Sequence, residues 1–157
     1  MRCNLRIFLL GFFCVLMLVG TGIASAGSVT FFVEVAPGFA ISLDDTLTFP
    51  QASPGDTVEA ELDVTIWSNV GWELMVSATA AQSGDGSPRS LEGGLEVLGA
   101  NGVWRPLDHI QRTVRTNEPP TSATGESFSV PFRFQAGFGD PPGTYTIQVE
   151  FTVVPEL

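Results

Sequence analysis

Apolar and polar side chains alternate along four segments of the chain, which is the pattern of a β-strand with one buried and one solvated face. In the segment Thr57–Ile66, Glu59, Glu61 and Asp63 share the polar face, and aliphatic residues fill the other. The same alternation recurs in Trp72–Ala78, Phe128–Phe134 and Tyr145–Val153. No segment keeps a helical period, so the pattern predicts an all-β, antiparallel fold.

Shorter segments with weaker alternation predict further strands: Val29–Val35, Phe39–Leu43, Thr46–Phe49, Leu95–Leu98, Val103–Leu107 and Ile110–Thr116. Glycines at positions 99 and 102 predict a hairpin between two of them, and the longest loops are expected at residues 81–89 and 117–126. Pro131 interrupts its strand, which predicts an edge position because proline donates no ladder hydrogen bond. About seven to ten short strands separated by turns predict an immunoglobulin-like β-sandwich.

The first 26 residues have a different character. Arg2 and Arg6 precede a charge-free apolar run, Ile7–Val19, and the small-residue triplet Ala24–Ala26 follows. This order is that of a secretory signal peptide. We predict cleavage after Ala26, leaving residues 27–157 as a single sandwich domain with no membrane span. An uncleaved membrane anchor is the alternative, because the longer segment Ile7–Ile23 approaches the ~20 residues of a spanning helix.

Export changes the composition of the working protein. The 157-residue chain has a formal net charge of −10, and its seven basic residues are all arginines. Removal of Arg2 and Arg6 leaves five arginines against 17 acidic residues, a net charge of −12. Both cysteines, Cys3 and Cys14, leave as well, so we predict no disulfide and no cysteine nucleophile. Such an acidic chain lacks the cations that neutralise phosphates, which excludes nucleic acid as a partner.

The catalytic inventory is poor. His109 is the only histidine, lysine is absent, and no serine lies in a G-x-S-x-G sequence. Glu59, Glu61 and Asp63 project at intervals of ~6.6–6.8 Å, a spacing that paired carboxylates of inverting glycosidases also have. A solvated sheet face has the same spacing, and we interpret the row in that way. We therefore predict that the protein is not an enzyme.

No cofactor is predicted from these residues, although acidic turns could supply oxygen ligands to calcium. The candidates are Asp44, Asp45, Asp85 and Asp140. Arg112 and Arg115 fall on opposite faces of one predicted strand, so a shared anion site would require a bulge in that strand.

Two tryptophans are candidates for ligand contact. Trp67 has the polar parity of its strand, and Trp104 lies in the predicted hairpin. Exposed indole rings beside polar groups can stack on sugar rings. The alternative is that both rings cover the ends of the sandwich.

Two motifs resemble a known family. Trp72-Glu73-Leu74 follows a long alternating strand, and Tyr145 opens a final strand that contains Phe151-Thr152-Val153. They resemble the WxL domains of Gram-positive cell surfaces and, more broadly, small exported immunoglobulin-like sandwiches. WxL domains carry a second W-x-L on the last strand, where this chain has Phe151 and Val153. The resemblance implies a sandwich that binds an envelope noncovalently, with Trp72, Leu74, Tyr145, Phe151 and Val153 as motif and core residues.

These observations predict a non-enzymatic module that is secreted or lies in the cell envelope, in an extracellular or periplasmic location, with a structural, assembly or adhesion role. The expected partner is an envelope component or another protein subunit, which could add a strand to an exposed sheet edge. The segment Val29–Val35 is of interest because terminal strands exchange readily between subunits. The alternative function is a carbohydrate-binding module that uses Trp67 and Trp104 to bind a glycan.

Overall fold

The computed structural model describes residues 30–156. The chain divides into two compact units, Met1–Glu34 and Val35–Leu157, and every strand of the described residues lies in the second unit. Residues 30–156 contain no helix, and so none that could cross a membrane. The predicted signal peptide, its cleavage site and both cysteines lie outside the described residues. The all-β prediction is confirmed.

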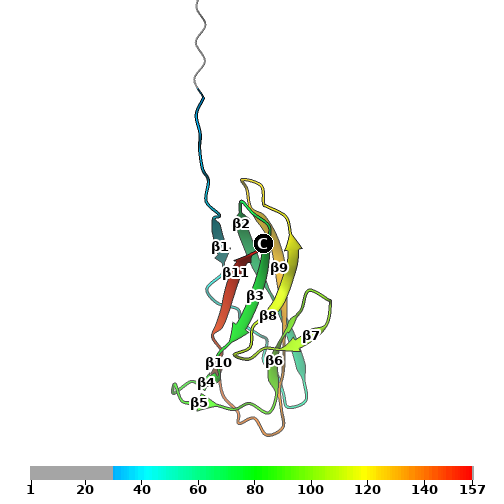
Figure 1. Ribbon diagram of the computed structural model, residues 1–157. Helices are drawn as coiled ribbons and strands as arrows, with labels where there is room; N and C mark the ends of the chain where they lie inside the picture. The colour runs from blue at the N-terminus through cyan, green and yellow to red at the C-terminus, as the bar shows by residue number, and fades with distance from the viewer. Residues whose placement is uncertain (1–29, 157) are drawn as a thin grey trace, which may run out of the picture. The chain divides into compact units, whose positions relative to one another are not determined.

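Eleven strands make up the second unit (Figure 1): β1 (Phe39–Leu43), β2 (Thr57–Ser68), β3 (Trp72–Ala78), β4 (Ala81–Ser83), β5 (Pro88–Arg89), β6 (Gly94–Leu98), β7 (Trp104–Pro106), β8 (Arg112–Glu118), β9 (Glu126–Gln135), β10 (Tyr145–Thr146) and β11 (Val149–Pro155). The count exceeds the expected seven to ten because β4, β5, β7 and β10 have only two or three residues each.

Two antiparallel sheets of unequal width enclose the core. The wide sheet has the order β1-β2-β9-β6-β7, and the narrow sheet has the order β11-β3-β8; β10, β4 and β5 form a small third sheet. The longest ladder joins β2 to β9, from Thr57 opposite Gln135 to Ile66 opposite Glu126. Alternate side chains of β2 and β3 point into the core, where Val64, Ile66, Trp72, Leu74 and Val76 have no exposed surface.

The strand positions match those of an immunoglobulin-like sandwich. In that fold, strands A, B, E and D form one sheet, and C, F and G form the other. Here β1-β2-β9-β6 take the positions of A-B-E-D, while β3 and β11 take those of C and F. The Tyr145 hydroxyl donates a hydrogen bond to the Pro141 carbonyl just before β11, as the tyrosine corner does at the start of strand F.

One consequence of this match concerns the position of strand G, which lies beside strand F in the complete fold. No strand among residues 30–156 pairs with the outer edge of β11. The narrow sheet instead extends on the other side of β3, through β8. The described part of the chain therefore forms a sandwich with an open edge at β11.

The strongly alternating segments are confirmed as strands β2, β3, β9 and β10–β11. The weaker predictions at Phe39–Leu43, Leu95–Leu98, Val103–Leu107 and Ile110–Thr116 correspond to β1, β6, β7 and β8. The predicted hairpin is also present, because β6 pairs with β7 and Gly102 adopts a φ of 72° in the turn.

Two predicted strands are wrong. Residues 46–49 pair with no neighbour, and the alternation there reflects Leu47 and Phe49 packing against the core from an irregular segment. Residues 30–35 of the segment Val29–Val35 also lie in no strand. Conversely, β4 and β5 lie within residues 81–89, which were predicted to form a loop. Alternation did not reveal these strands because only two residues of each are paired.

The edge position predicted from Pro131 is wrong as well. β9 is a central strand, paired with β2 on one side and with β6 on the other. Its pairing with β6 extends from Gln135 only as far as Phe132, so Pro131, the next residue toward the N-terminus, has no partner on β6. The proline is tolerated because only one neighbouring strand flanks it at that point.

Trp72 provides a test of the core. Its indole Nε1 is buried without a hydrogen-bond partner, and its ring stacks on Phe128 at 6.0 Å between centroids. We expect Trp72→Ala to cost about 3–5 kcal/mol in the free energy of unfolding, because it leaves a large cavity. Trp72→Phe should cost only about 1–2 kcal/mol, since no hydrogen bond is lost. Urea denaturation measures both; equal losses would show that the indole N–H has a partner.

Candidate functional site: the two margins of the sandwich

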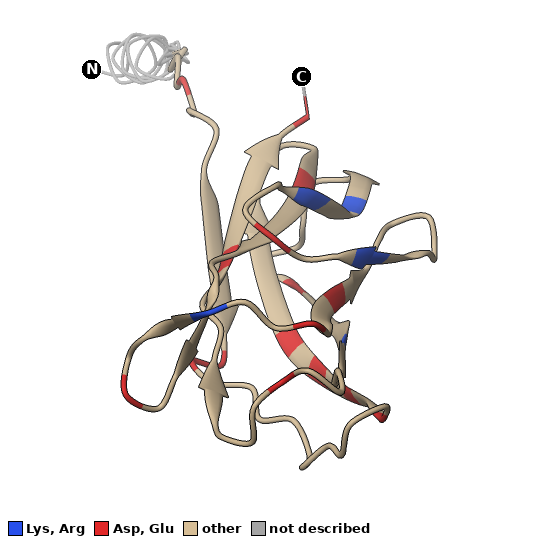
Figure 2. Ribbon diagram, turned by 90° about the horizontal axis from the view of Figure 1, so that it is seen from below, with Lys and Arg blue, Asp and Glu red and all other residues tan. Residues whose placement is uncertain are grey.

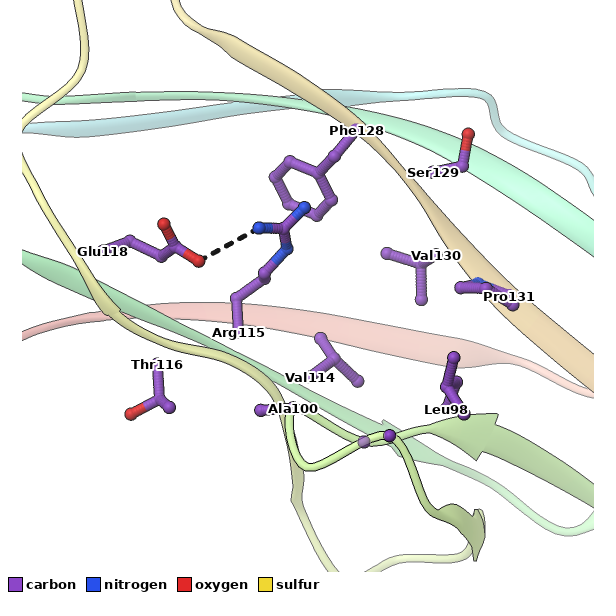
Figure 3. A pocket seen from close by; sticks show the side chains of 12 residues that line it. Leu98, Ala100, Val114, Arg115, Thr116, Glu118, Phe128, Ser129, Val130 and Pro131 are labelled. Atoms are coloured by element: carbon purple, nitrogen blue, oxygen red, sulfur yellow. Dashed lines mark hydrogen bonds and ion pairs between the residues drawn. The ribbon is translucent and has the colours of Figure 1, made fainter.

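The wide sheet has five strands and the narrow sheet has three. The core therefore has two long margins, along which side chains must cover it to exclude water. The first margin lies between β8 and β9 and contains a groove of about 390 Å³. Figure 3 shows its lining: Val114, Arg115 and Glu118 from the β8 side, Phe128 and Val130 from β9, and the β6–β7 turn below.

A stacked series of side chains closes the core at this margin. Phe128 lies against buried Trp72, and the Arg115 guanidinium carbon lies 4.3 Å from the centre of the Phe128 ring. Arg115 Nη1 also contacts Glu118 Oε1 at 3.1 Å. An arginine over an aromatic face gains about 0.5–1 kcal/mol at a partly exposed site. The two charges satisfy each other, so the groove presents no unpaired charge for a ligand.

The bulge that a shared anion site would require is present. The ladder between β3 and β8 shifts register around Leu74, so that Arg112 lies opposite Val76 and Arg115 opposite Leu74. Both arginines therefore lie on the inner face of the narrow sheet. Each nevertheless has its own carboxylate: Arg112 contacts Asp108 at 3.5 Å, and Arg115 contacts Glu118. The arrangement provides no common anion site.

The second margin, the β1/β11 edge, lies on the other side of the core and is formed by the outer edges of β1 and β11 (Figure 1). Phe39 and Ile41 of β1 lie opposite Ser68 and Ile66 of β2, so they face inward. Each is nevertheless 37% exposed, whereas Ile66 is fully buried. Inward-facing apolar side chains at this margin therefore remain in contact with solvent.

The facing strand is incompletely covered as well. Phe151 and Val153 of β11 lie opposite Val76 and Leu74 of β3. The β3 side chains have no exposed surface, whereas Phe151 and Val153 are only half-buried at the rim of the core. The uncovered apolar surface thus continues from β1 to β11.

The sheet edges differ in how they are protected. Charged side chains and prolines on an edge strand hinder pairing with another chain. The β7 edge carries Arg105 and Pro106, and the β8 edge carries Arg112 and Arg115. β1 has no charged residue or proline, and β11 has only Glu150 and a terminal proline. All three ion pairs of residues 30–156 lie away from β1 and β11.

Trp67 and Trp104 lie on the outer face of the wide sheet, but they do not form one platform. Their strands, β2 and β7, are separated by β9 and β6, which means three strand spacings or ~14 Å. One side of each ring is occupied: the Arg133 guanidinium carbon lies 4.6 Å from the centre of the Trp104 ring, and Trp67 packs on Gly125. A β-carbon added at Gly125 would lie 2.8 Å from the Trp67 ring.

The acidic residues are spread over many strands and turns, and Figure 2 shows no single acidic patch. Glu59, Glu61 and Asp63 are exposed on the outer face of β2, and Asp63 accepts a hydrogen bond from Ser129 at 2.6 Å. They do not line the groove at the first margin. His109 is exposed in the turn before β8.

Two of the four aspartates considered for calcium, Asp85 and Asp140, hold turns together. Asp85 accepts hydrogen bonds from the Ser83 hydroxyl and the Ser87 backbone, which lower its pKa to about 2. Partial burial acts to raise the pKa of Asp140, but backbone N–H groups of Glu92, Gly137 and Gly93 outweigh it and lower the pKa. Within residues 30–156, no three His, Cys, Asp or Glu side chains are grouped so that they could hold a metal ion.

No model of a known protein family matches this chain, and no curated protein matches it significantly. Among solved structures, a family 123 glycoside hydrolase from Clostridium perfringens, described in work on glycolipid glycan hydrolysis, aligns with a TM-score of 0.36 and 14% identity. The alignment covers 76% of this chain and 25% of that protein, so the chain spans a quarter of its length. A likeness this weak carries no information about activity.

The β1/β11 edge was not among the residues singled out from the sequence for ligand binding. Phe151 and Val153 were expected as core residues, and Phe39–Leu43 only as a strand. The missing information is the order of strands in the sheets, which brings together segments more than 100 residues apart. The only local signal is the absence of charge in Phe39–Leu43, which an edge strand of a monomer would normally avoid.

Asp140 gives a pH-dependent prediction. Its lowered pKa means that it stabilises the fold fully above its unfolded value near ~3.9 and loses this effect as the pH falls through the lower folded value. Because the carboxylate lies near the surface, where solvent screens its charge, we expect Asp140→Ala to cost about 0.5–1.5 kcal/mol at pH 7 and less near pH 2. Urea denaturation across this pH range measures the difference. Asp44→Ala, in an exposed turn, is the control and should have little effect at either pH.

Proposed function

We propose that this protein is an exported, non-enzymatic β-sandwich that serves as a structural or assembly module of the cell envelope or cell surface. The observation that carries the proposal is the open β1/β11 edge, where inward-facing Phe39 and Ile41 are exposed beside a strand edge without a partner among the described residues. In this proposal the edge accepts one β-strand from a partner.

Such an edge offers an incoming strand both main-chain hydrogen bonds and apolar contacts for its side chains. The outer backbone groups of β11 give main-chain hydrogen bonds, which provide affinity, and the apolar side chains beneath give contacts that select alternate side chains of the incoming strand. A strand added beside β11 would lie in the position of strand G and face β1 across the core. It would remove Phe39 and Ile41 from water, at about 25 cal/mol per Å² of apolar surface buried.

The location and the absence of catalysis are parts of the same proposal. The signal-peptide pattern of residues 1–26 supports export, and the resemblance to WxL domains supports a noncovalent attachment. The groove at the first margin is occupied by a satisfied Arg115–Glu118 pair, which offers no general acid, base or nucleophile for a reaction.

Ile41 tests whether this edge binds a partner. We expect exported wild-type protein to sediment with envelope fractions of the producing cells, and Ile41→Glu to abolish sedimentation because a buried carboxylate would replace an apolar contact. In the bound wild type, amide hydrogen exchange should slow in Val149–Pro155.

Ser42→Glu is the matched control, because it adds the same charge one residue away on the opposite, solvated face of β1. It should sediment like the wild type. Equal sedimentation of both variants, or none for the wild type, would contradict the proposal. Thermal unfolding of each variant checks that the sandwich itself is retained.

Carbohydrate binding through Trp67 and Trp104 is the rival function, and the separation of the two rings gives it less support. We expect titration with a panel of soluble glycans to leave the tryptophan fluorescence unchanged in the wild type and in Trp104→Ala. A saturable shift that disappears in Trp104→Ala would favour the carbohydrate-binding module instead.

A further inference from the structure

We infer that the strand accepted at the β1/β11 edge is the segment Thr30–Val35 of a second copy of this chain. This inference rests on the proposed function and names its partner. We refer to the segment as the N-terminal arm.

The arm has the side-chain pattern that the edge requires. Phe31, Val33 and Val35 share one parity, and Glu34 lies on the other. The side chains of Phe31, Phe32 and Val33 are between 82% and 94% exposed, far more than is usual for large apolar residues. When the arm is extended, one face presents three apolar side chains at the two-residue interval of a strand.

The arm also matches the edge in length and in free backbone groups. Six residues in extended conformation span about 20 Å, close to the span of the seven-residue β11. Residues 30–35 lie in no strand, and no backbone hydrogen bond joins them to another of the described residues. Both sides of the proposed contact therefore carry unpaired strand edges and exposed apolar residues.

The anchoring of the arm favours a second copy over the same molecule. Asn69 accepts a hydrogen bond from the Gly38 backbone and donates one to the Ala36 carbonyl, each at 2.8 Å. Residues 69–71 also hold the end of β11, because the Glu156 N–H donates to the Gly71 carbonyl at 2.9 Å. The base of the arm and the end of β11 thus lie at the same end of the sandwich.

From this position, an arm could reach its own β11 only by reversing within Ala36–Gly38 while crossing between sheets about 10 Å apart. The four Cα–Cα steps from Val35 to Phe39 span at most roughly 13–14 Å when fully extended, which leaves little length for the reversal. The arm would also run parallel to β11. The arm of a second copy has neither constraint and can pair antiparallel, which is the more stable arrangement.

Each copy then has one arm and one accepting edge. Contacts between such different surfaces are heterologous, so copies join head to tail unless two of them exchange arms reciprocally. The joining surfaces carry little charge, but each body is strongly acidic, and we expect association to strengthen as salt screens this repulsion.

The test compares Phe31→Glu with Phe32→Glu in protein recovered after export, its N-terminus read by mass spectrometry. Both residues are highly exposed, so neither change should unfold the sandwich. Phe31→Glu should weaken self-association, measured by analytical ultracentrifugation over a concentration series, at least about tenfold, because burial of a phenylalanine exceeds the ~1.4 kcal/mol that this factor represents. Phe32→Glu, on the other parity, should retain association.

A mixing experiment tests the polarity of the contact. Phe31→Glu has a defective arm and an intact edge, whereas Ile41→Glu has an intact arm and a defective edge. Each should associate at least about tenfold more weakly alone than the wild type does, and an equimolar mixture should form one-to-one dimers. A synthetic peptide of residues 30–37 should bind to Phe31→Glu protein and not to Ile41→Glu protein.

Several outcomes would overturn the inference: equal effects of Phe31→Glu and Phe32→Glu, a wild type that stays monomeric, or a mixture that does not associate. A concentration-independent loss of thermal stability in Phe31→Glu would show that the arm occupies its own edge. If Phe31→Glu still sediments with envelopes while Ile41→Glu does not, another strand fills the edge, and the proposed function stands without this inference.

Discussion

Two sheets of different width enclose one core, and the narrower sheet leaves apolar surface bare at its margins. Three strands cannot cover the inner faces of five, so each margin needs another means of excluding water. At the β8 margin, Arg115 extends over Phe128 and pairs with Glu118, so a paired charge closes the core there. At the β11 margin, no charged pair among the described residues covers the core, and Phe39 and Ile41 remain partly exposed to water. The asymmetry between the two margins determines which side of the molecule is suited to a partner.

The alternation of side chains predicted most of the fold because the strongest strands are long and face solvent on one side. The run from Thr57 to Ile66 keeps its period over ten residues, and no turn residue interrupts it. Prediction failed where alternation has another cause. Leu47 and Phe49 reach the core without pairing, and the arm alternates without any neighbour among the described residues. The edge position predicted from Pro131 failed for a related reason. β9 is a central strand, but at Pro131 it has a neighbouring strand on one side only.

The candidate site was less accessible from sequence because it depends on strand order and on register. The outward position of Trp67 follows from parity, yet its distance from Trp104 follows from the two strands that lie between β2 and β7. Likewise, parity placed Arg112 and Arg115 on opposite faces, and only the bulge opposite Leu74 puts them on the same face. The open edge required knowing that β11 pairs with β3, which no local pattern in Val149–Pro155 discloses.

The pairing of β3 with β11 has a consequence for how the molecule reaches its folded state. Trp72 lies opposite Pro155, and Thr57 lies opposite Gln135, so both main ladders join residues that are distant along the chain. Folds dominated by such contacts have a high contact order and fold in milliseconds to seconds. Moreover, the central strand of the narrow sheet gains its second neighbour only when residues up to 155 are available. A nascent chain of this sequence therefore cannot complete this core before residue 155 has been made, and the narrow sheet remains incomplete until then.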